Sequence, residues 1–292
     1  MSFTGDKKVI YLSSFRFPSW DEEYKFRLDD VKRTCYNTMY PFFVLSRHAL
    51  SELSFTEVTI LYGGNGSGKT TALNVIAEKI GAERASLYNR SSFFCDYLRC
   101  CSYGKEGRPA ASAVITSDDV FAYMLDVRAV NEGVDARREE LFEEYQRAKY
   151  DKFAVRSTED YDRLKNACDA RRMTQSKYVK SRLAENIREQ SNGESAFLYF
   201  TDRIKEGGLY FLDEPENSLA PDMQLKLRDF LFDSARFYGC QFIIATHSPF
   251  LLSMRGARIY DLDDDPVSIK KWTELKNVRA YFDFFNSHRG EF

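Results

Sequence analysis

Residues 63–70 read Gly63-Gly64-Asn65-Gly66-Ser67-Gly68-Lys69-Thr70, which fits the pattern G-x-x-x-x-G-K-[ST]. The preceding residues 58–62 are apolar and mostly β-branched or aromatic, and they predict a strand. The residues that follow predict an amphipathic helix to about Lys79, ended by Gly81. A strand, a glycine-rich turn and a helix in this order are typical of a phosphate-binding loop, and the order favours that interpretation over a chance glycine-rich turn.

Each residue type in this loop has a physical role in holding phosphate. The glycines let backbone N–H groups wrap around an anion, and the helix N-terminus adds its partial positive charge. Lys69 supplies a point charge for the β- and γ-phosphates, and the Thr70 hydroxyl can ligate Mg²⁺. The predicted nucleotide-binding residues are Gly63, Gly64, Asn65, Gly66, Ser67, Gly68, Lys69, Thr70 and Thr71.

A pair of carboxylates forms a second motif. Residues 209–212, Leu-Tyr-Phe-Leu, predict a buried strand, and Asp213 and Glu214 follow at its carboxyl end. Ligands gather at the carboxyl ends of the strands in open α/β sheets. We predict that Asp213 joins Thr70 in holding Mg²⁺ and that Glu214 is the general base that polarises the attacking water. The alternative is a strand-end turn rich in acids ahead of Pro215.

The composition is that of an ordinary globular protein. The chain has 292 residues, of which 43% are hydrophobic and 29% charged, and these proportions exclude a mostly disordered chain. No apolar stretch approaches the roughly 18 residues of a transmembrane helix, and the first residues lack the pattern of a signal peptide. The six cysteines form no CxxC pair, so we expect reduced thiols in a cytoplasmic protein. The net charge of −2 gives no global attraction to nucleic acid or to an anionic membrane.

Strand and helix patterns alternate outside residues 119–190, and this alternation favours a parallel or mixed α/β sheet. Besides residues 58–62, strands are predicted at residues 9–12, 42–45, 114–116, 209–212, 241–245 and 257–261. Helices are predicted near residues 221–237 and 272–287. In the latter segment Tyr281, Phe282, Phe284 and Phe285 are interpreted as core residues, with a dimer or partner surface as the alternative.

Residues 119–190 predict a helical arm. Apolar residues recur at helical spacing in two stretches, and Ser157 with Asp160 forms a capping-box-like start of the second stretch. One face of that second helix comprises Tyr161, Leu164, Cys168, Val179, Leu183 and Ile187. Many charges beside a narrow apolar stripe indicate a protruding helical hairpin. We therefore expect three segments: residues 1–118 with the phosphate loop, the arm at 119–200, and 201–292 as the rest of the nucleotide-binding lobe.

Part of the arm is basic. Residues 165–182 contain one acid, Asp169, against six basic side chains: Lys165, Arg171, Arg172, Lys177, Lys180 and Arg182. Contact with nucleic-acid phosphates is one interpretation of this local excess of positive charge. A solvated helical face is the more frequent explanation for such a pattern.

The adjacent Asp213 and Glu214, in place of a lone Asp, resemble the ABC-type ATPase superfamily, which includes transporter nucleotide-binding domains and soluble SMC- and RecF-like proteins. Residues 216–219, Glu-Asn-Ser-Leu, resemble its D-loop, and His247 at the end of a predicted strand resembles its switch histidine. The wording Asp-Glu-Pro-Glu-Asn-Ser-Leu, together with Thr-His-Ser-Pro, looks most like compact soluble bacterial AAA-family or RecF/OLD-like ATPases.

Residues 191–195, Ser-Asn-Gly-Glu-Ser, resemble the signature loop of the same superfamily. The match is partial, because Gln190 and Asn192 depart from the family pattern. The positions that match are Ser191, Gly193 and Glu194.

The resemblance implies an α/β fold, that of a P-loop ABC-type ATPase with a mixed β-sheet, N-terminal antiparallel strands and a helical-hairpin insertion. It also implies that Glu214, His247 and Lys69 act in ATP hydrolysis with ATP and Mg²⁺ as cofactors. Two protomers would stack head to tail around two ATP molecules. Ser191 and the Gly193 N–H of one protomer would then contact the γ-phosphate bound by the partner's Lys69, which places donors where charge develops.

Two expected parts lack a clear counterpart. The superfamily usually has a Gln after the strand that here ends near Thr116; Ser117 or Asp118 takes this role, or both serve in helix capping. Candidates for the aromatic side chain that stacks on adenine lie near the N-terminus: Tyr11, Phe15 and Phe17. Core packing is the simpler interpretation for each of these three aromatic residues.

Two functional hypotheses remain open. The first is a soluble ATPase whose ATP-dependent homodimer cycle serves DNA maintenance or phage defence. The second is a slowly hydrolysing, ATP-gated scaffold that binds an effector protein, with the arm as the contact to DNA or effector. A transporter motor subunit is a third and weaker interpretation, because the Gln is missing and the signature is imperfect.

Overall fold

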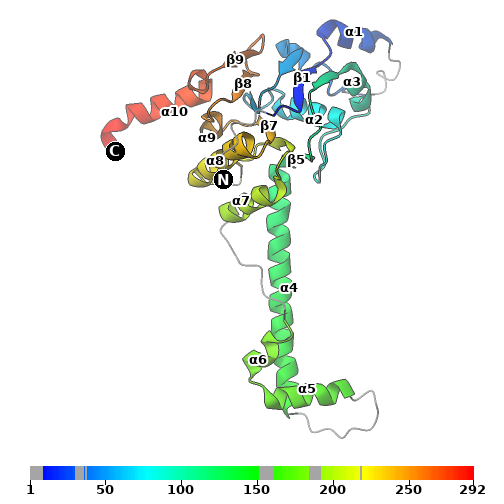
Figure 1. Ribbon diagram of the computed structural model, residues 1–292, viewed down its shortest axis with the longest axis vertical. Coiled ribbons are helices and arrows are strands. Elements are labelled where there is room, and N and C mark those ends of the chain that lie inside the picture. Colours follow the sequence, from blue (N-terminus) through cyan, green and yellow to red (C-terminus); the bar gives the residue numbers. More distant parts are fainter. Residues whose placement is uncertain (1–8, 30–35, 37, 151–160, 184–191, 218) are drawn as a thin grey trace, which may run out of the picture. The chain divides into compact units, whose positions relative to one another are not determined.

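The computed structural model describes residues 9–29, 36, 38–150, 161–183, 192–217 and 219–292. The chain forms two compact units, the first from residues 1–121 with 192–292 and the second from residues 122–191. Figure 1 shows the elements of each unit. The first unit carries both β-sheets and the second is helical. The functional division into a nucleotide-binding lobe and an arm stays a proposal.

The larger sheet of the first unit is the predicted mixed sheet. In spatial order its strands are β5 (Ser112–Thr116), β6 (Leu209–Asp213), β7 (Gln241–Ala245), β3 (Val58–Tyr62), β8 (Arg258–Asp261) and β9 (Ser268–Lys270). All neighbouring pairs are parallel except β8 and β9, which are antiparallel. All five residues of β3 are buried, because the strand lies between β7 and β8. The strands predicted from these apolar runs are confirmed, and β9 was not predicted.

A smaller antiparallel sheet confirms the expected N-terminal strands. Its order is β2 (Glu52–Ser54), β1 (Leu12–Arg16) and β4 (Ser102–Lys105). The strand predicted at residues 9–12 is wrong in its bounds, since it overlaps β1 only at Leu12. The backbone N–H groups of Tyr11 and Leu12 donate to the side-chain Oε1 of Gln241, each at 2.9 Å. This side-chain contact replaces the strand pairing that the apolar run predicted at Tyr11.

The strand predicted at residues 42–45 is wrong. These residues form a turn that leads into the short 3₁₀ helix η2 (Ser46–His48), and Phe43 has a positive φ of 64°. The turn buries both Phe42 and Leu45, and Phe42 stacks on Phe26 of helix α1 (Trp20–Asp29) with ring centroids 4.5 Å apart. The aromatic run therefore indicated burial correctly but not the backbone conformation.

Besides α1 and η2, the described part of the first unit has eight further helices. They are α2 (Lys69–Ile80), α3 (Phe94–Cys100), α7 (Asn192–Arg203), α8 (Pro221–Phe237), α9 (Pro249–Leu252), η4 (Trp272–Glu274), α10 (Lys276–Ser287) and η5 (Arg289–Glu291). Of these, α2 and α8 contact strands of the larger sheet. The predicted stop of α2 is confirmed, because Gly81 caps it at φ 76°. The helix predicted at 221–237 is confirmed with those bounds. No helix of the described residues is long and apolar enough to span a membrane.

The interpretation of the aromatic residues of α10 as core is wrong. Tyr281, Phe282, Phe284 and Phe285 are each more than half exposed. The helix rests on the first unit through Leu275, just before it, and Val278. The apolar spacing predicted a helix with an apolar stripe, which is present, but that spacing cannot tell whether the same chain covers the stripe.

The second unit contains most of α4 (Ser117–Tyr150), which begins in the first unit, together with α5 (Tyr161–Arg172) and α6 (Gln175–Lys180). The prediction of one long second helix is wrong, because Thr174 caps α6 by accepting a hydrogen bond from the Lys177 N–H. Ser157, Asp160 and Ile187 lie outside the described residues. The unit has its own small core, made of Leu141, Tyr145, Ala170, Tyr178 and Val179.

Candidate functional site

The glycine-rich loop connects β3 to α2 at the carboxyl edge of the larger sheet. Gly66 and Gly68 have φ values of 84° and 92°, a region that favours glycine. A Cβ on Gly68 would also lie 2.9 Å from the Leu45 side chain. The loop therefore wraps tightly at the N-terminus of α2, where backbone N–H groups and the helix dipole favour an anion.

Two side chains of the loop fit a bound phosphate. The Lys69 side chain is only 5% exposed, and its Nζ donates to the carbonyl oxygens of Gly63 at 2.7 Å and Gly64 at 2.9 Å. The ammonium is thus held over the loop. The buried Ser67 Oγ has no hydrogen-bond partner among the described residues, so the loop contains an unused donor. Asn65 is exposed, whereas Thr71 is buried and its hydroxyl accepts from Tyr40 at 3.3 Å.

The predicted magnesium ligands lie side by side. The Thr70 hydroxyl donates to Asp213 Oδ1 at 3.0 Å across the gap between α2 and the end of β6. Burial raises the pKa of Asp213 from 3.8 to about 6, and the neighbouring Glu214 adds to the increase. The raised pKa indicates that too little positive charge surrounds the buried Asp213 carboxylate. A Mg²⁺ ion bound to the oxygen atoms of Asp213 and Thr70 would supply that charge. Among the described residues no group of three or more His, Cys, Asp or Glu side chains forms a metal site.

Glu214 lies between the lysine and the histidine. Its backbone has a positive φ of 47°, and its N–H donates to the Ala245 carbonyl of β7 at 2.8 Å. Its Oε1 is 4.0 Å from Lys69 Nζ and 3.8 Å from His247 Nδ1. Its Oε2 accepts from Asn217 Nδ2 at 3.1 Å. Strained backbone at a non-glycine residue is typical of functional sites, because surrounding contacts must hold it.

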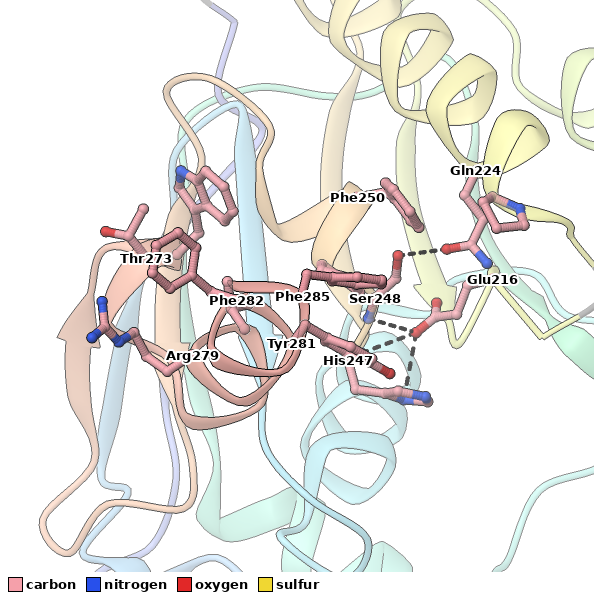
Figure 2. A pocket seen from close by; sticks show the side chains of 14 residues that line it. Glu216, Gln224, His247, Ser248, Phe250, Thr273, Arg279, Tyr281, Phe282 and Phe285 are labelled. Carbon is pink, nitrogen blue, oxygen red and sulfur yellow. Dashed lines mark hydrogen bonds and ion pairs between the residues drawn. The ribbon is translucent and has the colours of Figure 1, made fainter. Parts of the chain in front are cut away.

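Glu216 holds the turn that carries His247, a role that the sequence did not predict. Its Oε1 accepts from the Thr246 hydroxyl at 2.6 Å. It also accepts from the backbone N–H groups of His247 and Ser248 at 2.9 and 3.1 Å (Figure 2). The side chain is buried, and Ser248 donates in turn to Gln224 at 2.6 Å. The D-loop resemblance drew attention to this position, but the three hydrogen bonds depend on tertiary structure.

Asp263 is a second residue that sequence reasoning missed. Both of its carboxylate oxygens lie 2.9 Å from the Gly64 N–H, at the start of the phosphate loop. The register explains this contact, because Tyr62 pairs with Asp261 and the two chains leave β3 and β8 together. Asp261 and Asp264 are paired with Lys270, whereas Asp263 has no ion-pair partner among the described residues.

The candidate signature loop is described only in part. Ser191 lies outside the described residues. Gly193 and Glu194 are in the first turn of α7, and a Cβ on Gly193 would lie 3.3 Å from the Met223 side chain in α8. The roles of all three residues stay proposals.

The position of the missing Gln is at the carboxyl end of β5, where Thr116 is in register with Asp213. Thr116 and Asp119 cap α4 there: Asp119 Oδ2 accepts from the Thr116 N–H and hydroxyl, each at 2.8 Å. Ser117 and Asp118 are therefore not needed as caps. Asp118 is exposed and Ser117 half-buried at this edge, so both stay candidates.

The candidates for adenine stacking do not reach the phosphate loop. Phe15 and Phe17 are fully buried in the core, which confirms the simpler interpretation for both. The Tyr11 hydroxyl donates to the Gly239 carbonyl at 3.0 Å, just before β7 begins. That is the opposite end of the parallel strands from the phosphate loop.

A glycine-rich loop, a pair of carboxylates and a histidine therefore meet at the edge of a mixed sheet, and these residues form the site of a P-loop ATPase. The chain belongs to the family described as "AAA domain, putative AbiEii toxin, Type IV TA system", whose model matches residues 105–253, just over half of the chain. No curated protein matches it.

Three solved structures resemble the chain at low sequence identity. The SMC head domain from Thermotoga maritima is 13% identical, with 90% of this chain and 99% of that chain covered at a TM-score of 0.39. The Smc head domain bound to the C-terminal domain of ScpA, from Pyrococcus furiosus, is 13% identical over 82% and 95% at 0.38. A putative metal-chelate type ABC transporter, in an inward-facing conformation, is 17% identical over 77% and 76% at 0.35.

Proposed function

We propose that the protein is a Mg²⁺-dependent ATPase that works as a head-to-tail, ATP-sandwiched dimer and couples hydrolysis to phage defence or DNA maintenance. The observation that carries this proposal is the convergence of five side chains from three separate segments of the sequence at one sheet edge. The Thr70 hydroxyl donates a hydrogen bond to Asp213. Lys69 Nζ and His247 Nδ1 both lie within 4.0 Å of Glu214 Oε1.

The chemistry follows from these positions. Lys69 and the loop N–H groups bind the β- and γ-phosphates, and Thr70 with Asp213 would hold Mg²⁺, which neutralises phosphate charge. Glu214 accepts the proton of the attacking water, and its neighbour His247 orients the γ-phosphate. Glu216 keeps His247 in place through the turn. Ser191 and the Gly193 N–H of a second copy would donate hydrogen bonds to the outer side of the γ-phosphate.

The biological coupling rests on the family and on the arm. The family description names a toxin of a type IV TA system, which favours an effector-linked role over transport. The arm exposes Lys165, Arg171, Arg172, Lys177 and Lys180. Arg182 makes its contacts inside the arm: it forms an ion pair with Asp169 at 2.8 Å, and its guanidinium lies 3.8 Å from the centre of the Tyr178 ring. The exposed basic residues favour an anionic partner, DNA or an acidic surface of an effector protein.

The mass of Glu214→Gln in solution, with and without Mg-ATP, tests the sandwich. This variant keeps the binding groups but loses the base, so ATP accumulates at the site and the mass should double. Adding Ser191→Arg should abolish the doubling while ATP still binds. An unchanged mass of Glu214→Gln with ATP bound would refute the self-sandwich and point to the ATP-gated scaffold with a different partner.

A further inference from the structure

Helix α10 presents an aromatic surface to solvent. Tyr281, Phe282, Phe284 and Phe285 are 51%, 58%, 57% and 54% exposed, and Trp272 just before the helix is 40% exposed. Every residue from 279 to 287 is exposed. A helix of 12 residues is marginal in water by itself, so most of its stability must come from packing. The described residues supply that packing at only one end of the helix.

A groove runs along this helix. A cavity of about 650 Å³ is lined by Val278, Tyr281, Phe282 and Phe285 of α10 and by the start of α9 at Pro249 and Phe250, and His247 of the candidate site also lines it. Figure 2 shows Tyr281, Phe282 and Phe285 with Phe250 and His247. The four helix residues are spaced i, i+3, i+4 and i+7, which places them on one face. The molecule therefore carries an apolar groove and an apolar helical stripe side by side.

We propose that this groove, defined by α10 and the start of α9 at Pro249 and Phe250, takes the α10 helix of a second copy of the chain. The two helices lie antiparallel, and each stripe fills the other copy's groove. The contact needs no nucleotide. It therefore differs from the ATP sandwich of the proposed function and does not depend on that function being right.

The exposed area is what such a dimer needs. An aromatic side chain contributes about 150–250 Å², so five of them exposed by about half offer roughly 500 Å² per copy. A two-fold contact doubles this to about 1,000 Å², which is the lower bound of a stable biological interface. An apolar patch of roughly 500 Å² is as large as the largest patch of a typical monomer, and such patches often serve as interaction sites.

The charges on α10 are self-complementary in the antiparallel arrangement. Arg279 and Asp283 lie two residues before and two residues after Tyr281, on the same flank of the stripe. When two α10 helices pack antiparallel with their Tyr281 residues opposite each other, the same flank of each helix faces the other copy. Arg279 of each copy then lies opposite Asp283 of the other. Asp283 has no ion-pair partner among the described residues, so it is available for this contact. A parallel arrangement would place like charges level with each other, which disfavours it.

The test is the mass of the full-length chain in solution without nucleotide and with EDTA, at micromolar concentration. We expect a dimer for the wild type and a monomer for the double variant Phe282→Asp with Phe285→Asp. Leu87→Asp is the matched control, because Leu87 is 96% exposed outside α10 and its change should leave the dimer intact. ATP binding by the double variant shows that it is folded.

The charge pair gives a second, independent readout. Arg279→Asp should weaken the dimer at least tenfold, and the combined Arg279→Asp and Asp283→Arg should restore it. A wild-type chain that is monomeric without nucleotide would overturn the proposal and leave the groove to a different partner. A dimer that survives the double Phe variant would overturn it as well. Failure of the sandwich alone would show up only as loss of the ATP-dependent mass change, so the two results are distinguishable.

Discussion

The buried carboxylate of Asp213 makes the candidate site sensitive to pH. Its pKa is raised from 3.8 to about 6 by burial. In the nucleotide-free protein, ionising this group therefore opposes folding. The resulting loss of unfolding free energy is absent below about pH 4 and grows as the pH rises to 6. Above pH 6 it stays constant at about 3 kcal/mol or less.

Asp213→Asn should accordingly raise the melting temperature of the nucleotide-free protein above pH 6 and leave it unchanged below pH 4. Melting curves in EDTA at pH 4 and pH 7.5 measure this difference. In the wild type, Mg²⁺-dependent ATP binding should weaken about tenfold at pH 5, where roughly a tenth of the carboxylate is ionised. Equal melting temperatures of the two proteins at pH 7.5 would contradict the buried, cation-deficient carboxylate.

Asp263 should position the start of the phosphate loop through the Gly64 N–H. Asp263→Ala removes this acceptor and should weaken ATP binding about tenfold, which corresponds to about 1.4 kcal/mol. Asp263→Asn keeps an acceptor without the charge, so its affinity should equal or exceed that of the wild type. Titration with a fluorescent ATP analogue separates the two variants. Tighter binding by Asp263→Ala would show that the carboxylate only repels phosphate.

Sequence reasoning found the residues of the site that come from contiguous motifs. Lys69, Thr70, Asp213 and Glu214 follow buried strands, and the structure brings them together as the strand-end rule requires. Asp263 was missed because its contact with Gly64 joins two segments about 200 residues apart. Such a contact follows from the pairing of β3 with β8, which a local pattern does not reveal.

The turn between β7 and α9 is held by a single carboxylate, and this defines a prediction for the element. Glu216→Ala removes the acceptor of three hydrogen bonds and should free the His247 turn. We expect kcat to fall at least tenfold with little change in KM, and stability to fall by about 3 kcal/mol. Glu216→Gln keeps one acceptor oxygen and should retain most of the activity. Steady-state kinetics of both variants, with thermal melting, test this role.

Leu141 anchors the small core of the second unit. Leu141→Ala should destabilise that unit by about 2–5 kcal/mol, because it opens a cavity in a core of few residues. Since the phosphate loop belongs to the first unit, the affinity for ATP should stay unchanged. Protease cleavage within residues 122–191, together with ATP titration, measures both effects. A parallel loss of ATP affinity would mean that the two units fold as one.

At the scale of elements, periodicity predicted what the chain buries better than how it bends. The runs at β3, β6 and β7 are mostly apolar, and nearly all of their residues are buried. The run at 42–45 looks similar but forms a turn. The break before α6 depends on one capping residue, Thr174, inside a pattern that otherwise continues as a helix.

For the whole molecule, two contacts with second copies are expected, one through ATP and one through α10. They use different groups: the sandwich needs Ser191 and Gly193, and the α10 contact needs the aromatic stripe. Two different two-fold contacts on one chain build assemblies larger than a dimer. ATP should then double the mass of a resting dimer, and in the Phe282→Asp with Phe285→Asp variant it should convert monomers to dimers.

The measurement that tests the central claim most directly is ATP hydrolysis by a mixture of Glu214→Gln and Ser191→Ala chains. Each variant alone should be nearly inactive, since each lacks one half of every composite site. A mixed dimer contains one complete site, with Glu214 from one copy and Ser191 from the other. An equal mixture should therefore recover up to about a quarter of the wild-type rate. A mixture as inactive as its components, although both bind ATP, would contradict a site shared between two copies.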